Sequence, residues 1–143
     1  MIAKEFMRHP VVTIAPEAGL DRALVIMRTQ RIRHLPVVDA RHEMIGLITD
    51  RDLRISMQEM EAGPEKAPKG LYLPALIKVQ SVMKTNVITA HLQTTAAEAT
   101  KKLLDNKIGC LPVLEDNSNK VIGIITETDM LRLLARILKE KGI

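Results

Sequence analysis

Two short motifs in this sequence combine a hydroxyl group with a carboxylate at a fixed spacing. They are Thr49-x-x-Asp52 and Thr126-x-x-Asp129, and each follows an apolar run where a helix is expected to begin. The free N–H groups and the positive dipole of a helix N-terminus can hold an anion. An aspartate three residues on can accept two hydrogen bonds from a cis-diol. The same spacing is also a variant of the capping box, which stabilises a helix by about 1 kcal/mol. Both interpretations stay open, and the threonine can serve both.

The two motifs belong to an internal duplication. The run 31–52 returns at 107–129, with L-P-V and G-h-h-T-x-x-D (h, apolar) in both copies. The offset is 76 residues up to Asp39 and 77 from Ile45 onwards, and 13 of the 41 positions aligned in this way are identical. A repeat kept only for packing would not need to keep polar residues, yet both copies do. The duplication therefore predicts a pair of related pockets.

The two pockets should differ in their chemistry. Arg33-His34 in the first copy becomes Gly109-Cys110 in the second, directly before the strand expected to border each pocket. Arg33 and His34 could donate charge-assisted bonds to a phosphate, with arginine favoured for its fork geometry. Alternatively, His34 bonds a nearby carbonyl and Arg33 is solvated. Gly109 would allow a ligand close to the backbone, and Cys110 is expected to be a small buried apolar residue.

Each copy contains the same order of predicted elements. A short strand at 11–14 precedes a helix opening at Pro16-Glu17, and 87–89 precedes the equivalent helix. The apolar stripes of these helices are Leu20, Ala23, Leu24 and Met27, and Ala96, Ala99, Thr100 and Leu103. Two strands joined by a turn follow in each copy, at 35–38 and 44–48 in the first and at 111–114 and 121–125 in the second. A second helix then begins, at Thr49 in the first copy and at Thr126 in the second. The order in each repeat is therefore β-α-β-β-α.

The fold class that follows is α/β (α+β), with two repeats packed sheet to sheet in pseudo-twofold symmetry, because each sheet has a face that its own helices leave uncovered. The predicted boundaries are 1–60 for the first repeat, 61–76 for a linker and 77–143 for the second repeat. The linker is placed by the polar Gly/Pro stretch at 61–70. Together the repeats should form one compact module.

Composition limits the functional classes. The chain has 143 residues, 46% of them hydrophobic, and no apolar run approaches the roughly 20 residues of a membrane span. Cys110 is the one cysteine and the N-terminus does not resemble a secretory signal, so a cytoplasmic protein is expected. The formal charge of +4 is scattered among acidic residues, and the aromatic residues are Phe6 and Tyr72 alone, which disfavours nucleic-acid binding. The excess positive charge suits small phosphorylated ligands.

No motif indicates catalysis. The sequence lacks a phosphate-binding G-x-x-x-x-G-K-[ST] loop, G-x-G-x-x-G, H-E-x-x-H and a nucleophile elbow. No resident metal site is expected either. The carboxylates of Asp50, Asp52, Glu127 and Asp129 could at most attract Mg²⁺ brought by a nucleotide. The remaining histidines, His9, His42 and His91, are expected in loops or turns without a functional role.

The sequence contains the pattern h-x-x-L-P-V twice, followed each time by a turn and then by G-h-h-T-x-x-D. This doubled pattern resembles a tandem pair of cystathionine β-synthase (CBS) domains. Within that family, the chain is similar to the CBS portion of acetoin-utilisation-type proteins. The matching runs are I-R-H-L-P-V-V and G-L-I-T-D-R-D-L-R in the first copy, and I-G-C-L-P-V and G-I-I-T-E-T-D-M-L in the second. The resemblance covers about residues 3–134. It implies a regulatory, energy-sensing module that binds AMP, ADP, ATP or S-adenosylmethionine in two clefts between the repeats.

The resemblance also implies roles for single residues. Asp52 and Asp129 would hold the ribose, with Thr49 and Thr126 near ribose or phosphate. Thr13 and Thr89 would line the base and ribose side, although their hydroxyls could equally bond the backbone of a turn. Without an aromatic residue to stack on, an adenine ring would lie between aliphatic side chains, which are more commonly core. The full candidate set is Thr13, Ile32, Arg33, His34, Leu35, Pro36, Ile48, Thr49, Asp52, Thr89, Ile108, Gly109, Cys110, Pro112, Ile125, Thr126 and Asp129.

The last predicted helix, 130–138, is apolar on two faces. Met130, Leu133 and Ile137 form one stripe, and Leu131, Leu134, Ala135 and Leu138 form the other. A helix with two apolar faces needs two partners, expected to be its own sheet and a second subunit. The family resemblance implies that such a homodimer is disc-like. Three functions therefore remain: a ligand sensor that acts on an unidentified protein partner, a structural dimerisation module whose motifs only cap helices, and a nucleic-acid-binding module.

Overall fold

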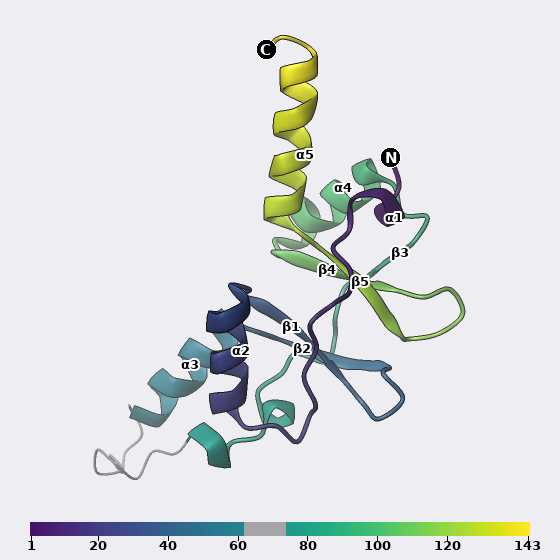
Figure 1. The fold of residues 1–143 in the computed structure, drawn as a ribbon. Coiled ribbons are helices and arrows are strands. Elements are labelled where there is room, and N and C mark those ends of the chain that lie inside the picture. The colour runs from purple at the N-terminus through teal and green to yellow at the C-terminus, as the bar shows by residue number, and fades with distance from the viewer. Residues whose placement is uncertain (62–73) are drawn as a thin grey trace. The chain divides into compact units, whose positions relative to one another are not determined.

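The computed structural model describes residues 1–61 and 74–143 (Figure 1). Most of the predicted linker, at 62–73, lies outside the described residues, and Pro74–Leu76 form a short 3₁₀ helix, η1. The backbone contacts divide the chain into a continuous unit, Val12–Val87, and a discontinuous unit, Met1–Val11 with Ile88–Ile143. The sequence boundaries at 1–60 and 77–143 remain a prediction about the repeats.

The continuous unit is built on a β-hairpin between two helices. Its helices are α2 (Leu20–Gln30) and α3 (Asp50–Glu61), and its strands are β1 (His34–Val38) and β2 (Met44–Thr49). The strands pair antiparallel, with His34 opposite Thr49. A short 3₁₀ helix, η2 (Val79–Ser81), also belongs to this unit. The predicted hairpin and both helices are confirmed.

The discontinuous unit repeats this plan with the N-terminal segment added. It contains α1 (Ala3–Phe6), β3 (Ala90–His91), α4 (Ala96–Asn106), β4 (Cys110–Leu114), β5 (Val121–Thr126) and α5 (Glu127–Glu140). The strand order is β3-β4-β5, with β3 parallel and β5 antiparallel to β4. Thr95 caps α4 in a capping box with Glu98, and the backbone hydrogen bond from Thr95 lowers the pKa of the Glu98 carboxyl.

The first strand of each repeat is shorter than predicted. Of residues 11–14, Ile14 alone pairs, as one parallel bridge to Val37, and pairing in the second repeat begins at Ala90 instead of Val87. The reason lies in the L-P-V motif. Extending either parallel ladder towards the N-terminus would require an N–H group from Pro36 or Pro112, and proline has none.

Helix α2 also begins later than predicted, at Leu20 and not at Pro16-Glu17. The preceding turn is used for tertiary hydrogen bonds. The N–H of Val79 donates to the carbonyl of Ala18 at 2.8 Å, and the N–H of Gln80 donates to that of Pro16 at 3.0 Å. The predicted inward stripe is nevertheless confirmed, because Leu20, Ala23 and Met27 are buried.

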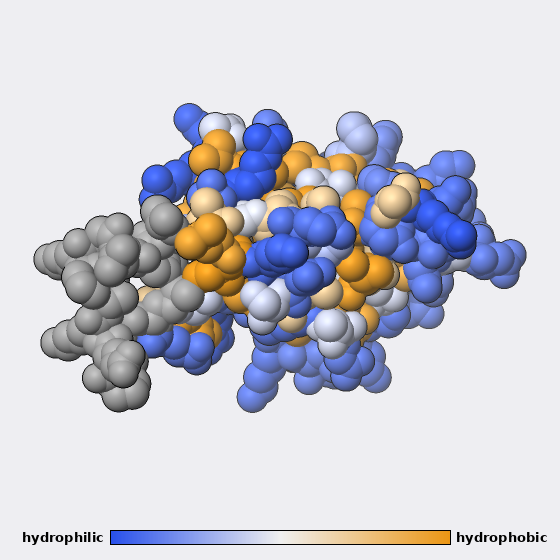
Figure 2. All heavy atoms as spheres, turned by 90° about the horizontal axis from the view of Figure 1, so that it is seen from below, coloured by the Kyte–Doolittle hydropathy of each residue, from blue (hydrophilic) through white to orange (hydrophobic). Residues whose placement is uncertain are grey.

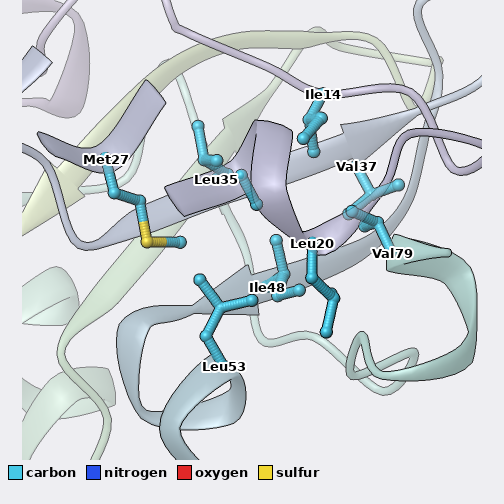
Figure 3. Packing of buried hydrophobic residues seen from close by; sticks show 9 residues of the cluster. Ile14, Leu20, Met27, Leu35, Val37, Ile48, Leu53 and Val79 are labelled. Atoms are coloured by element: carbon cyan, nitrogen blue, oxygen red, sulfur yellow. The ribbon is translucent and has the colours of Figure 1, made fainter. Parts of the chain in front are cut away.

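Each unit has its own hydrophobic core, and each core includes a residue from the segment that precedes the other repeat. Val79 is wholly buried in the continuous unit and belongs to one cluster with Ile14, Leu20, Ala23, Met27, Leu35, Val37, Ile48 and Leu53 (Figure 3). Ala3, the equivalent residue at the 76-residue offset, is wholly buried in the other core. The segments before the two repeats are therefore exchanged.

Two equivalent glycines accommodate the exchanged segments. Lys84 exchanges two backbone hydrogen bonds of 2.9 Å with Leu47 on β2, and Arg8 exchanges bonds of 2.9 and 3.0 Å with Ile124 on β5. A Cβ atom at Gly46 would lie 2.9 Å from the Lys84 carbonyl oxygen, while Met83 also crowds the position. A Cβ atom at Gly123 would lie 3.2 Å from the Arg8 carbonyl oxygen and would crowd the Met7 side chain, so both glycines favour the close approach of the crossing segment.

We expect Gly46→Ala to lower the free energy of unfolding by about 1–3 kcal/mol, since an added methyl group must displace the crossing segment. Urea denaturation measures the loss. Because Met83 shares the contact, Gly46→Ala combined with Met83→Ala should cost less than the sum of the single changes. Full additivity would show that the two residues do not compete for the same space.

Candidate functional site

The hairpins bring sequence-distant candidate residues together at the start of the last helix of each repeat. In the continuous unit, His34 lies opposite Thr49, and the N–H of Asp50 donates to the carbonyl of Arg33 at 3.0 Å. In the discontinuous unit, Cys110 lies opposite Thr126, and the N–H of Glu127 donates to the carbonyl of Gly109 at 3.0 Å. The residues before each L-P-V motif therefore border a Thr-x-x-Asp turn.

Both Thr-x-x-Asp turns form reciprocal caps. Asp52 Oδ2 accepts from the N–H of Thr49 at 3.0 Å and from its hydroxyl at 2.9 Å, while the N–H of Asp52 donates to Thr49 Oγ1 at 3.2 Å. Asp129 Oδ2 accepts from the N–H and hydroxyl of Thr126, both at 2.8 Å, and the N–H of Asp129 donates to Thr126 Oγ1 at 3.3 Å. The capping interpretation is thus confirmed. It uses only one oxygen of each carboxylate.

The other oxygen of each aspartate faces a cation from the exchanged segment. Arg8 Nε donates to Asp129 Oδ1 at 2.8 Å, and Arg132 Nη1 lies 3.7 Å from the same oxygen. Lys84 Nζ lies 3.6 Å from Asp52 Oδ1. Sequence reasoning missed Arg8 and Lys84, although their equivalence at the 76-residue offset was an available signal.

The apolar candidates are placed in the cores. Leu35, Pro36, Ile48, Pro112 and Ile125 are essentially fully buried, and Ile32 and Ile108 pack against the two clusters from outside. Their packing is that of core residues, the alternative left open by the sequence. Arg33 is exposed and His34 half-buried, whereas Cys110 is buried.

The two early threonines are placed differently. Thr13 lines a hollow of about 430 Å³ with neighbouring residues 14–17 and 38–40, and Asp52 is not among its lining residues. The carbonyl of Thr89 accepts from Lys102 Nζ at 2.8 Å.

A hollow lies beside each Thr-x-x-Asp aspartate. The hollow beside Asp52 has a volume of about 460 Å³ and is lined by Asp52, Ile55, Ser56, Glu59, Ile77, Ser81 and Val82. The hollow beside Asp129 has a volume of about 210 Å³ and is lined by Glu5, Phe6, Asp129, Arg132, Leu133 and Arg136. At the repeat offsets, the six residues of the smaller hollow are equivalent to six residues of the larger one. Each hollow lies within one unit.

Comparison with known proteins agrees with this doubled arrangement. The CBS domain family model matches residues 3–59 and 79–136. The chain belongs to the CBS domain family. A CBS domain-containing protein of Dictyostelium discoideum is 36% identical over 139 residues, which cover 97% of this chain and 94% of that protein.

Two solved structures are similar to this CBS pair. One is the CBS domain pair of protein MJ0100 in complex with 5′-methylthioadenosine and S-adenosyl-L-methionine, with a TM-score of 0.82, 25% identity and coverage of 96% of this chain and 98% of that one. The other is AcuB from Vibrio cholerae, a protein assigned to acetoin utilization, with a TM-score of 0.81, 27% identity and coverage of 99% and 96%. The family predicted from the sequence is confirmed.

Within residues 1–61 and 74–143, no helix is both long enough and apolar enough to span a membrane. The same residues contain no group of three or more His, Cys, Asp or Glu side chains arranged to hold a metal ion.

We expect Thr126→Ala to lower the free energy of unfolding by about 1–2 kcal/mol, because it removes the hydroxyl that both donates to and accepts from Asp129. Thr126→Ser should retain most of the stability. Thr128→Ala, at an exposed position in the first turn of α5, is the matched control and should change the stability by less than about 0.5 kcal/mol. Equal losses for Thr126→Ala and Thr128→Ala would contradict the capping role.

Proposed function

We propose that this CBS pair is a regulatory sensor of an adenosine-containing ligand, namely AMP, ADP, ATP or S-adenosylmethionine. The observation that carries the proposal is the Thr49–Asp52 turn, which caps α3 with one carboxylate oxygen and leaves Oδ1 without a hydrogen bond shorter than 3.5 Å among the described residues. The MJ0100 CBS pair, which has a similar fold, holds two adenosine compounds.

The proposed roles follow from hydrogen-bonding capacity. Asp52 accepts hydrogen bonds from the ribose diol, as an ionised carboxylate does well. Arg33 and His34, which border the same turn through β1 and β2, donate to phosphate. In the second repeat, Gly109 and Cys110 offer no charged donor at the equivalent positions, so any ligand there would be held without that phosphate contact.

The regulatory part of the proposal is a change in the population of two arrangements of the module on binding, which a partner protein reads. The role is energy sensing in the cytoplasm, without catalysis. Any Mg²⁺ would arrive with a nucleotide. Thr13 and Thr89 stay candidates for the base and ribose side.

We expect at least one of AMP, ADP, ATP and S-adenosylmethionine at millimolar concentration to raise the melting temperature of the purified protein. A ligand present at a hundred times its Kd stabilises the folded state by about 2.7 kcal/mol, which corresponds to several degrees for a chain of this size. Asp52→Ala should abolish the rise, because it removes the acceptor for the diol.

Asp50→Ala is the matched control. Asp50 is another first-turn acid of α3, and it is more exposed than Asp52 and 3.9 Å from Arg54. The control should keep the ligand-induced rise. The sensor proposal is wrong if no ligand moves the melting temperature of the wild-type protein while Asp52→Ala simply melts lower.

We also propose a homodimer formed through α5. In the stripe of Met130, Leu133 and Ile137, Leu133 is buried and Met130 packs against the core of its unit, whereas Ile137 is exposed. The other stripe is uncovered, with Leu131 64% and Leu134 49% exposed. Figure 2 shows a different face, on which apolar patches lie among hydrophilic residues, and the stripe itself is identified from the exposure of its side chains. A second copy would cover the α5 stripe.

We expect light scattering at micromolar concentration to give twice the chain mass, and Leu131→Glu with Leu134→Glu to give a monomer, since two buried charges without partners oppose association. Lys139→Glu, at another exposed position on α5, should remain a dimer. A wild-type monomer under these conditions would overturn the dimer proposal.

A further inference from the structure

The two aspartates of the doubled motif have different surroundings at their second oxygen. Asp129 Oδ1 accepts a hydrogen bond of 2.8 Å from Arg8, with Arg132 as a second cation at 3.7 Å. Asp52 Oδ1 has Lys84 at 3.6 Å, too far for a hydrogen bond, and the lysine side chain is 62% exposed. Both oxygens of Asp129 are therefore hydrogen-bonded within the protein, whereas Asp52 Oδ1 has no hydrogen bond from the residues that the structure describes.

The space beside the two aspartates differs in the same direction. The hollow beside Asp52, at about 460 Å³, falls within the range of about 300–1,000 Å³ usual for small-molecule sites, and that beside Asp129, at about 210 Å³, falls below it. The repeat substitutions give a reason. Ser56 and Val82 are replaced by the larger Leu133 and Phe6, and Ile55 is replaced by Arg132.

We propose, on the basis of the proposed function, that the aspartates have separated into two roles. Asp52 binds the diol of the adenosine ligand. Asp129 is a structural latch that holds the N-terminal segment on β5 through Arg8. Each chain then binds one ligand.

Electrostatics explains why a ligand does not displace Arg8. The Asp129 side chain is only 7% exposed, so moving the Arg8 guanidinium away would remove the hydrogen-bonded cation of a sheltered carboxylate and leave only the more distant, exposed Arg132 beside it. A neutral diol can return hydrogen bonds but no charge. At Asp52, the ammonium of Lys84 balances the charge from 3.6 Å, and no other described residue bonds Oδ1, so a diol can bind without breaking an ion pair.

The test is isothermal titration calorimetry of the full chain with AMP and, separately, with S-adenosylmethionine as probes. We expect one probe molecule per chain. Asp52→Asn should weaken binding about tenfold or more, because it removes a charged acceptor. Asp129→Asn should keep the stoichiometry and stay within about threefold of the wild-type Kd, a difference smaller than the loss of one hydrogen bond. Asp50→Asn is the matched control for a lost first-turn charge.

Thermal melting without ligand gives the complementary readout. Asp129→Asn should melt several degrees lower than Asp52→Asn. Arg8→Gln breaks the latch from the other side and serves as the second variant if Asp129→Asn does not fold. Its matched control is Lys84→Gln, which should leave the melting temperature nearly unchanged because the equivalent ion pair is long and its lysine side chain is mostly exposed.

The outcomes separate the two proposals. Two probe molecules per chain, or an Asp129→Asn variant that folds but binds as weakly as Asp52→Asn, would overturn the division of roles and leave the sensor function intact. Equal melting losses for Arg8→Gln and Lys84→Gln would overturn the latch. If neither probe binds the wild-type chain, the assignment of Asp52 fails together with the sensor function.

Discussion

The structure depends on a backbone pairing that neither repeat can provide for itself. The outer edge of each hairpin, on β2 or β5, receives a short segment from before the other repeat, through the paired hydrogen bonds of Lys84 with Leu47 and Arg8 with Ile124. An unpaired strand edge would leave backbone N–H and carbonyl groups without partners. The same segments bring Val79 and Ala3 into the two cores. Edge pairing and core filling are therefore coupled, and glycine at positions 46 and 123 leaves room for the crossing segments.

The exchanged segments also determine the electrostatics of the candidate site. The residue that follows the crossing methionine is Lys84 in one unit and Arg8 in the other, and in each case its side chain approaches the aspartate of the Thr-x-x-Asp turn. Arg8 donates a hydrogen bond of 2.8 Å to Asp129 Oδ1, whereas the Lys84 ammonium lies 3.6 Å from Asp52 Oδ1. The two equivalent aspartates therefore differ in whether the cation of the crossing segment is hydrogen-bonded to Oδ1. The segments that pair with the strand edges therefore also supply the cations beside the two aspartates.

Capping and ligand binding are compatible in this geometry. A carboxylate has two oxygens, and the cap uses Oδ2 in both repeats. A motif that caps helices in both copies can therefore have kept a ligand-binding role in one copy, since the cap fixes the orientation of the side chain. Fixing a polar group in advance reduces the entropy cost of binding a ligand.

The sequence was informative about local structure. Apolar periodicity predicted the stripe of α2 because burial follows helical spacing, and the alternation of runs and turns predicted both hairpins. The first strands and the start of α2 were misplaced, since the missing N–H of proline and the hydrogen bonds of Val79 and Gln80 act between segments distant in sequence. Within the candidate site, the threonine and aspartate motifs were predicted, but their cations were not.

By itself, the sequence determined the duplication, the CBS family and the residues of the two Thr-x-x-Asp turns, because these are recorded in residue type and spacing. Only the tertiary structure decided which segment completes which sheet and which cation faces which aspartate. A pattern of neighbouring residues carries no information on pairing across more than a hundred positions, as between Arg8 and Asp129. That pairing depends on the strand edges and on the core positions that the exchanged segments fill, and both exist only once the chain has folded.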